Sequence, residues 1–235
     1  MTHPVAAARI GEPAAVRADV GARPAARWAP LTGIAFVVFF LGAVVAGNVP
    51  SDNATTAAWL AAYTGSGKQF GHEASGVLLV LAALSLMSFL VVLWSRIGDL
   101  RPGERRTPVP VVAAGISAAC IAVGGALMAV GSTVTGAFAG ATAPAAATVA
   151  RFANDAGFTM VAAPGMLAAA LSVGLLSTQA YRAGLFGRKM WIFGIAVAVI
   201  LLASLAFVPI LALLLWLIVT AILLIRRPGS RADRG

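Results

Sequence analysis

The chain has 235 residues, of which 60% are hydrophobic and 11% charged, and its net charge is +9. Soluble domains carry about 25% charged residues, so this composition excludes a water-soluble globular protein as well as a disordered or collagen-like chain. Only one cysteine is present, Cys120, which excludes a disulfide scaffold. The composition predicts a polytopic membrane protein.

Six apolar segments follow one another along the chain and predict transmembrane helices. Each is close to the ~20 residues that cross a hydrocarbon core of ~30 Å. All Lys, Arg, Asp and Glu residues lie outside these segments. The segments cover residues 31–49, 74–94, 111–131, 157–180, 191–207 and 210–225.

The last two segments form one stretch without charge, residues 191–225. A single helix of that length would be about 52 Å long, which is too long for a bilayer without extreme tilt. Pro209 lies in this stretch and favours a tight outer hairpin between two helices. The predicted fold class is therefore all-α, a bundle of six transmembrane helices.

Basic residues predict how the bundle is oriented. The N-terminal tail, the second connection, the fourth connection and the C-terminal tail carry four, four, three and four Lys or Arg residues, fifteen of the seventeen. Only Lys68 and Arg151 fall on the opposite side. By the positive-inside rule both termini are expected in the cytoplasm, in a multi-pass protein of the plasma membrane. An aromatic belt is expected at the same helix ends, formed by Trp28, Trp94, Tyr181 and Trp191.

Three regions are expected along the chain. Residues 1–28 form a disordered basic tail, residues 29–225 the transmembrane domain, and residues 226–235 a second basic tail. The basic residues are divided among four clusters that flank apolar segments, so we expect contact with anionic lipids and no nucleic acid partner.

The first outer loop predicts a short amphipathic helix over residues 54–63. The SDN sequence at 51–53 offers an N-cap, and the GSG sequence at 65–67 stops the helix. Trp59 and Tyr63 are four residues apart and share one face. This helix is expected either to lie on the outer membrane surface or to cap the bundle.

The third connection predicts a helix that begins at Pro144 and runs over residues 145–163 into the fourth apolar segment. The alternative is a helix start capped by Asn154 or Asp155.

Small residues give two further predictions. Pro164 and Gly165 are a candidate kink in the fourth helix, either for packing or as a hinge or pocket wall. The third segment is rich in glycine and alanine, so it is expected at the centre of the bundle. A GxxxG sequence at 136–140 lies beyond that segment and is weak support for dimerisation.

Chemistry-bearing residues are few. The two histidines are His3 and His72, so a haem held by two histidines between helices is excluded, and no cofactor or metal site is expected. No catalytic motif is present, so we do not expect an enzyme. A candidate outer polar cluster could bind a polar headgroup, a small ligand or a proton, or could consist only of helix caps and loose ion pairs. Its members are Lys68, His72, Glu73, Arg151, Asn154 and Asp155.

Four stretches resemble a group of uncharacterised six-span membrane proteins best known from actinobacteria, a family defined by a domain of unknown function. They are the outer helix and second span at 56–84, the Asn-Asp step and downstream proline at 147–170, the basic turn at 181–199, and the closing hairpin at 207–227. The turn departs from the family's usual Pro-Arg-Trp-like step. The resemblance implies a fold and a membrane location, and brings no activity or catalytic residue.

Three functions remain open. The leading hypothesis is non-enzymatic binding of a lipid, a lipophilic ligand or a protein partner, by a sensor or accessory subunit. The second is a small proton-coupled permease in which Glu73 or Asp155 takes the proton, although no inverted repeat is detectable. The third is an interfacial enzyme acting on lipid through His72 and Asp155. Expected partners are membrane lipids and a protein partner or second copy of the chain.

Overall fold

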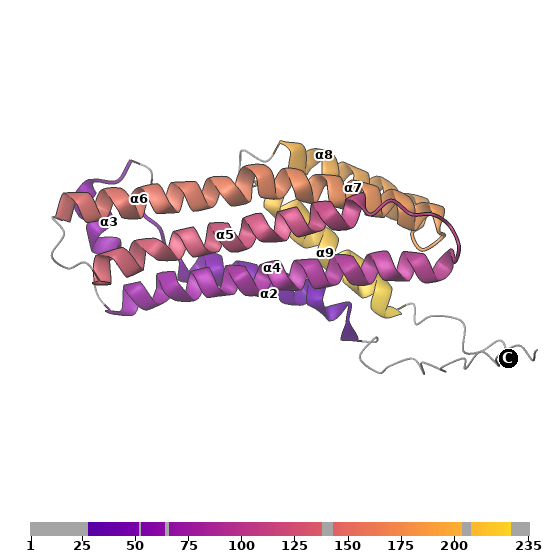
Figure 1. Ribbon diagram of the computed structural model, residues 1–235, viewed down its shortest axis with the longest axis horizontal. Coiled ribbons are helices and arrows are strands. Elements are labelled where there is room, and N and C mark those ends of the chain that lie inside the picture. The colour runs from indigo at the N-terminus through magenta and orange to yellow at the C-terminus, as the bar shows by residue number, and fades with distance from the viewer. Residues whose placement is uncertain (1–27, 52, 64–65, 138–142, 204–207, 227–235) are drawn as a thin grey trace, which may run out of the picture.

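The computed structural model describes residues 28–51, 53–63, 66–137, 143–203 and 208–226. Within these ranges all regular structure is helical and no strand occurs, which confirms the all-α class. The helices run side by side along one long axis (Figure 1). Both predicted tails lie almost wholly outside the described residues, and their disorder stays a prediction.

Eight α-helices and one π-helical turn make up the described part of the chain. They are α2 (Leu31–Ala46), α3 (Thr56–Tyr63), α4 (Ser66–Leu100), α5 (Val109–Ala137), α6 (Ala143–Met160), η1 (Val161–Gly165), α7 (Met166–Arg182), α8 (Arg188–Leu202) and α9 (Val208–Arg226).

Four helices in the described ranges are long and apolar enough to cross a membrane. They are α4, α5, the rod formed by α6, η1 and α7, and α9. Helices α2 and α8 have 16 and 15 residues, fewer than the ~20 that a straight crossing needs. Conversely α4 has 35 residues and a length of about 52 Å, so part of it extends beyond a ~30 Å core.

The stretch around Pro209 forms two helices, because α8 ends at Leu202 and α9 begins at Val208. Pro209 is the second residue of α9, where its missing N–H costs no hydrogen bond. The connecting residues 204–207, where the hairpin was expected, lie outside the described part.

Helix α5 packs against α4, α6, η1 and α7. The expectation that its small residues place it at the centre of the bundle is wrong, because α5 is the least buried of the four long apolar helices, with Val112 57% and Ile116 51% exposed.

The close approach of α5 to α4 and α6 depends on glycines. A Cβ atom at Gly124 would lie 2.7 Å from the carbonyl oxygen of Gly157 on α6, and one at Gly76 would lie 2.9 Å from the carbonyl oxygen of Gly125. Larger side chains would therefore push α4 and α6 away from α5.

The fourth apolar segment belongs to one continuous helical rod, Ala145–Arg182. This confirms the predicted helix through residues 145–163, and the alternative start at Asn154 or Asp155 is wrong. At Pro164 the rod widens into the π turn η1, in which the Met166 N–H donates to the Val161 carbonyl five residues earlier. A π turn accommodates a residue that disturbs the α-helical ladder, and a hinge at Pro164 and Gly165 stays a prediction.

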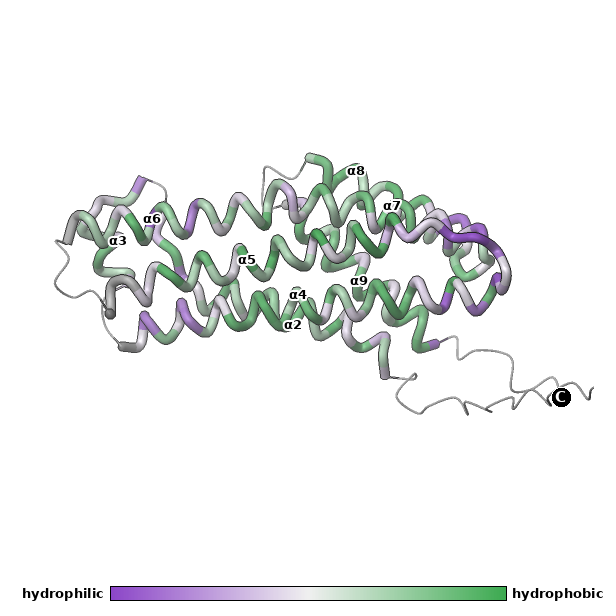
Figure 2. The backbone as a smooth tube through the Cα atoms, in the orientation of Figure 1, coloured by the Kyte–Doolittle hydropathy of each residue, from purple (hydrophilic) through white to green (hydrophobic). Residues whose placement is uncertain are grey.

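Basic side chains collect at one end of the bundle, where α4 ends, α5 begins and α7 turns into α8 (Figures 1 and 2). The Arg106 guanidinium lies 4.5 Å from the Trp94 ring centroid and donates to the Trp94 carbonyl at 2.8 Å. Tyr181 stacks on Trp191 with ring centroids 5.2 Å apart. We call this the basic end, defined by Arg96, Arg101, Arg105, Arg106, Arg182, Arg188, Lys189 and Arg226.

Candidate functional site

The opposite end of the bundle carries the short helix α3, and we call it the α3 end (Figure 1). The Ala58 N–H donates to the Thr55 side-chain oxygen at 3.2 Å, so Thr55 caps α3. The predicted cap at 51–53 is wrong, because the helix begins at Thr56, two residues after the predicted start at residue 54. The predicted end of this helix at Tyr63 is confirmed, and the next helix, α4, begins already at Ser66.

Helix α3 caps the bundle, the second of the two placements that its sequence allowed. Trp59 is 1% exposed and Tyr63 is fully buried. Both rings pack against Ala147 and Ala150 of α6. The apolar face of α3 is therefore covered by protein.

Four side chains from three helices form a ring column at the α3 end. Tyr63 stacks on the His72 imidazole of α4, with ring centroids 4.1 Å apart and planes 12° from parallel. Trp59 also stacks on Tyr63, with ring centroids 6.1 Å apart and planes 9° from parallel. The Arg151 guanidinium of α6 lies 6.0 Å from the Trp59 ring centroid, at the limit of a cation–π contact. The column links α6, α3 and α4.

The two titratable rings of the column both favour their neutral forms. Burial, and then the negative charge of Asp155, raise the pKa of Tyr63 to about 12. His72 lies two residues before the apolar segment 74–94. Burial lowers the pKa of His72, and a hydrogen bond to the Ala62 backbone partly opposes this shift. A neutral imidazole that donates one N–H keeps its other nitrogen as an acceptor.

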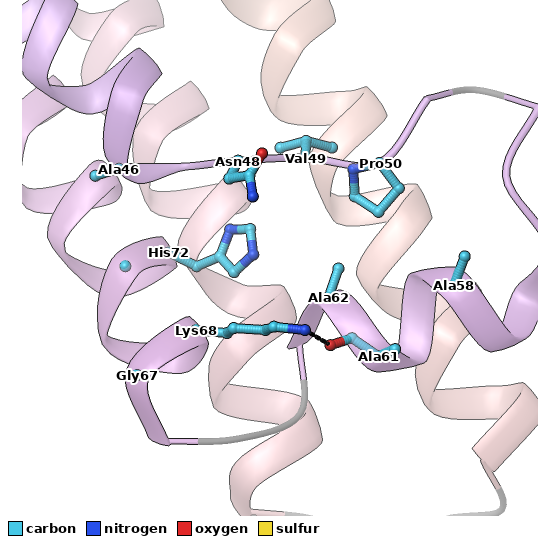
Figure 3. A pocket seen from close by; sticks show the side chains of 11 residues that line it. Ala46, Asn48, Val49, Pro50, Ala58, Ala61, Ala62, Gly67, Lys68 and His72 are labelled. Carbon is cyan, nitrogen blue, oxygen red and sulfur yellow. Dashed lines mark hydrogen bonds between the residues drawn. The ribbon is translucent and has the colours of Figure 1, made fainter.

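A cavity of about 510 Å³ opens beside His72 (Figure 3). We call it the polar pocket; it lies between the α2–α3 connection, α3 and the first two turns of α4. Asn48 points towards the His72 ring across the cavity (Figure 3). The Lys68 ammonium donates to the Ala61 carbonyl of α3 at 2.7 Å, and both residues line the pocket.

A second cavity, of about 280 Å³, lies directly beyond the connection and is lined by α2, α4, α5, α6, η1 and α9. We call it the apolar pocket. Its polar lining is small: Ser75 already donates to the Ala43 carbonyl at 2.8 Å, which leaves the amides of Asn48 and Asn154. Asn48 and Val49 line both cavities. The apolar side chains of the lining are Phe40, Val44, Leu79, Met128, Phe158, Val161 and Ile210.

The predicted outer polar cluster is divided among three places. Lys68 and His72 line the polar pocket, and Asn154 lines the apolar pocket. Arg151 and Asp155 are exposed on α6 and form an ion pair at 3.9 Å. Glu73 is exposed and lines neither cavity.

Sequence reasoning missed Asn48 and the stacking of Tyr63 on His72. The spacing of Trp59 and Tyr63 indicated a shared face, but the ring that Tyr63 meets belongs to another helix. Across the described residues no group of three His, Cys, Asp or Glu side chains is placed to hold a metal ion.

Comparison with protein-family models, with curated proteins and with solved structures gives no match to this chain.

Proposed function

We propose that this protein is a six-span plasma-membrane protein that binds an amphipathic, lipid-like ligand at its outer end and does not transform it. The observation that carries the proposal is the pair of adjoining cavities, with Asn48 and Val49 in the wall of both. The larger cavity has Lys68 and His72 among alanines and other small apolar residues in its wall, and the wall of the smaller one is almost wholly apolar. An amphipathic molecule has the same division between its head and its tail. Both volumes are near or within the roughly 300–1,000 Å³ of small-molecule pockets.

The apolar pocket has walls that are accessible from the side of the bundle. Val44 and Phe158 line it and are 46% and 39% exposed. In a bilayer such side chains face acyl chains, so a lipid tail has a direct path into the cavity. Glu73 and Asp155 line neither cavity, so no observation favours the permease.

The proposed topology has both termini in the cytoplasm and the α3 end outside. It is supported by the basic residues of the opposite end, which Figure 2 shows as a hydrophilic stretch of the backbone. Helices α2 and α8 complete the six spans as short crossings, which local thinning of the bilayer accommodates. The resemblance to the six-span family agrees with this proposal.

Native mass spectrometry of the protein, extracted gently from its own membrane, tests the function. We expect one lipid-like molecule bound stoichiometrically. Val44→Trp should fill the mouth of the apolar pocket and remove the bound mass. Val45→Trp is the matched control, because Val45 is 81% exposed and lines neither cavity. No stoichiometric mass on the unaltered protein, or equal retention by both variants, would overturn the proposal.

A further inference from the structure

The polar pocket holds groups whose hydrogen-bonding capacity is only partly used. The Lys68 ammonium has three N–H donors, of which one bonds the Ala61 carbonyl. Among the described residues no carboxylate forms an ion pair with Lys68. The remaining donors and the uncompensated charge suit an anionic group.

Helix α4 adds to the attraction for an anion. Gly67, Lys68 and Gly71 belong to its first two turns and line the pocket. The N-terminus of a helix carries a partial positive charge that favours anions. Glu73, the nearest carboxylate along α4, is exposed and outside the lining.

Whereas Lys68 favours a ligand group that accepts hydrogen bonds, His72 favours one that donates a hydrogen bond. Stacking on Tyr63 fixes the ring plane, and a neutral imidazole has one nitrogen that accepts a hydrogen bond. His72 is only 5% exposed and belongs to the pocket lining, so a ligand hydroxyl that reaches this nitrogen replaces little water. Asn48, directed at the same ring (Figure 3), can donate to or accept from that hydroxyl.

We infer that the polar pocket recognises a phosphate group that carries a neighbouring hydroxyl, as in a phosphodiester with a glycerol head. Lys68 binds the phosphate, and His72 and Asn48 bind the hydroxyl. This inference rests on the proposed function, because the acyl chain of the same molecule then lies in the apolar pocket. A choline head fits poorly, since it has no hydrogen-bond donor and its positive charge faces Lys68.

Lipid competition in native mass spectrometry tests the head chemistry with three phospholipids of equal chain length. Phosphatidylglycerol has a net negative charge and a head hydroxyl, and phosphatidylmethanol has the net charge without the hydroxyl. Phosphatidylcholine has a phosphate whose charge its own ammonium group balances, and no hydroxyl. We expect the protein to prefer phosphatidylglycerol over phosphatidylcholine about tenfold, the size of one charge-assisted hydrogen bond, and over phosphatidylmethanol by severalfold.

Three variants divide the preference into its parts. Lys68→Gln should abolish the preference for both anionic lipids over phosphatidylcholine. His72→Phe keeps a ring against Tyr63, and it should abolish only the preference for phosphatidylglycerol over phosphatidylmethanol. Asn48→Ala changes a residue in an exposed connection and should reduce the preference for phosphatidylglycerol over phosphatidylmethanol. It replaces His72→Phe in the test if that variant does not fold. Lys189→Gln at the basic end is the control. It should change neither the preference for anionic lipids over phosphatidylcholine nor the preference for phosphatidylglycerol over phosphatidylmethanol.

Each result is decisive. Lipid binding without headgroup preference, or a preference that all three pocket variants leave unchanged, overturns this inference while the proposed function stands. If the unaltered protein binds none of the three lipids specifically, the proposed function is overturned. Glycerol 1-phosphate is the soluble arm: displacement of the lipid by it, dependent on Lys68 and His72, supports the head chemistry and identifies a soluble phosphate ester as a competing source. If glycerol 1-phosphate does not displace the lipid, the phosphate group that the pocket recognises belongs to a lipid.

Discussion

His72 stacks on the face of Tyr63, and the backbone of Ala62 acts on its pKa. Both effects depend on α3 being docked, since both partners belong to that helix. The charge of His72 and the docking of α3 are therefore linked: protonation would place an uncompensated charge in a buried stack. Lys68 on the same helix face adds a repulsive charge nearby, while Glu73 points to solvent.

Stability should fall as the pH drops below the unfolded pKa of His72, about 6.5. The folded protein holds this pKa lower, so in acid the unfolded chain takes up a proton that the folded chain does not. Stability is therefore complete above pH 6.5 and is lost as the pH falls towards the folded pKa.

Thermal unfolding followed by circular dichroism at about pH 7.5 and about pH 5.5 checks this expectation. The melting temperature of the unaltered protein should fall between these values, and that of His72→Phe should change much less. His3→Gln removes the other histidine and should behave like the unaltered protein. An equal fall in His72→Phe would contradict the linkage.

At the scale of elements, α3 is the part of the site most open to test. Trp59 provides its largest buried side chain and lies between Tyr63 and Arg151 in the ring column. Trp59→Ala should cost about 3–5 kcal/mol of local stability, which is more than an eight-residue helix can supply from its own propensity. Undocking of α3 should then leave the rest of the bundle intact.

Hydrogen exchange with mass spectrometry measures this directly. Protection should be lost over residues 56–63 and at the start of α4 in Trp59→Ala, and retained in α5 and α7. Phe70→Ala is the control, because Phe70 is 72% exposed on α4. Unchanged protection over 56–63 would show that α3 is held by other contacts.

The elements also show what sequence could and could not predict. The apolar segments and the positions of the prolines predicted the α6–α7 rod and the break near Pro209, because both are signals in the local sequence. The GSG sequence at 65–67 correctly predicted that α3 ends at Tyr63, but it carried no signal that α4 begins as early as Ser66. There the Lys68 side chain binds the Ala61 carbonyl near the end of α3, and such a tertiary contact outweighs weak helix propensity.

The polar pocket was only half predictable. Lys68 and His72 stood out because charged and imidazole side chains are rare in this chain. Asn48 carried no signal, because its position opposite His72 depends on how the α2–α3 connection crosses the end of α4. The ring column likewise needs three helices to be packed before Tyr63 and His72 can meet.

At the scale of the whole molecule, the two ends differ in charge. The basic end carries most of the described arginines, whereas the α3 end combines Lys68 and Arg151 with Glu73 and Asp155. The difference predicts that the basic end lies in the cytoplasm.

Cysteine labelling in intact cells tests this orientation. In a Cys120→Ala background, which removes the one native thiol, Ala57→Cys on exposed α3 should react with a membrane-impermeant maleimide. Arg105→Cys, exposed at the basic end, should react only after the cells are lysed. The reverse pattern would place the polar pocket in the cytoplasm.

The central claim is that a lipid-like molecule occupies the adjoining pockets, and photolabelling tests it most directly. The reagent is a phospholipid with a photoreactive group on its acyl chain, incorporated into bilayers with the full chain. Label is expected to concentrate in peptides that contain residues 40–49 and 158–161, and an excess of unlabelled lipid should displace it. Label spread evenly over exposed apolar positions elsewhere, such as Leu84 and Val112, would contradict the claim.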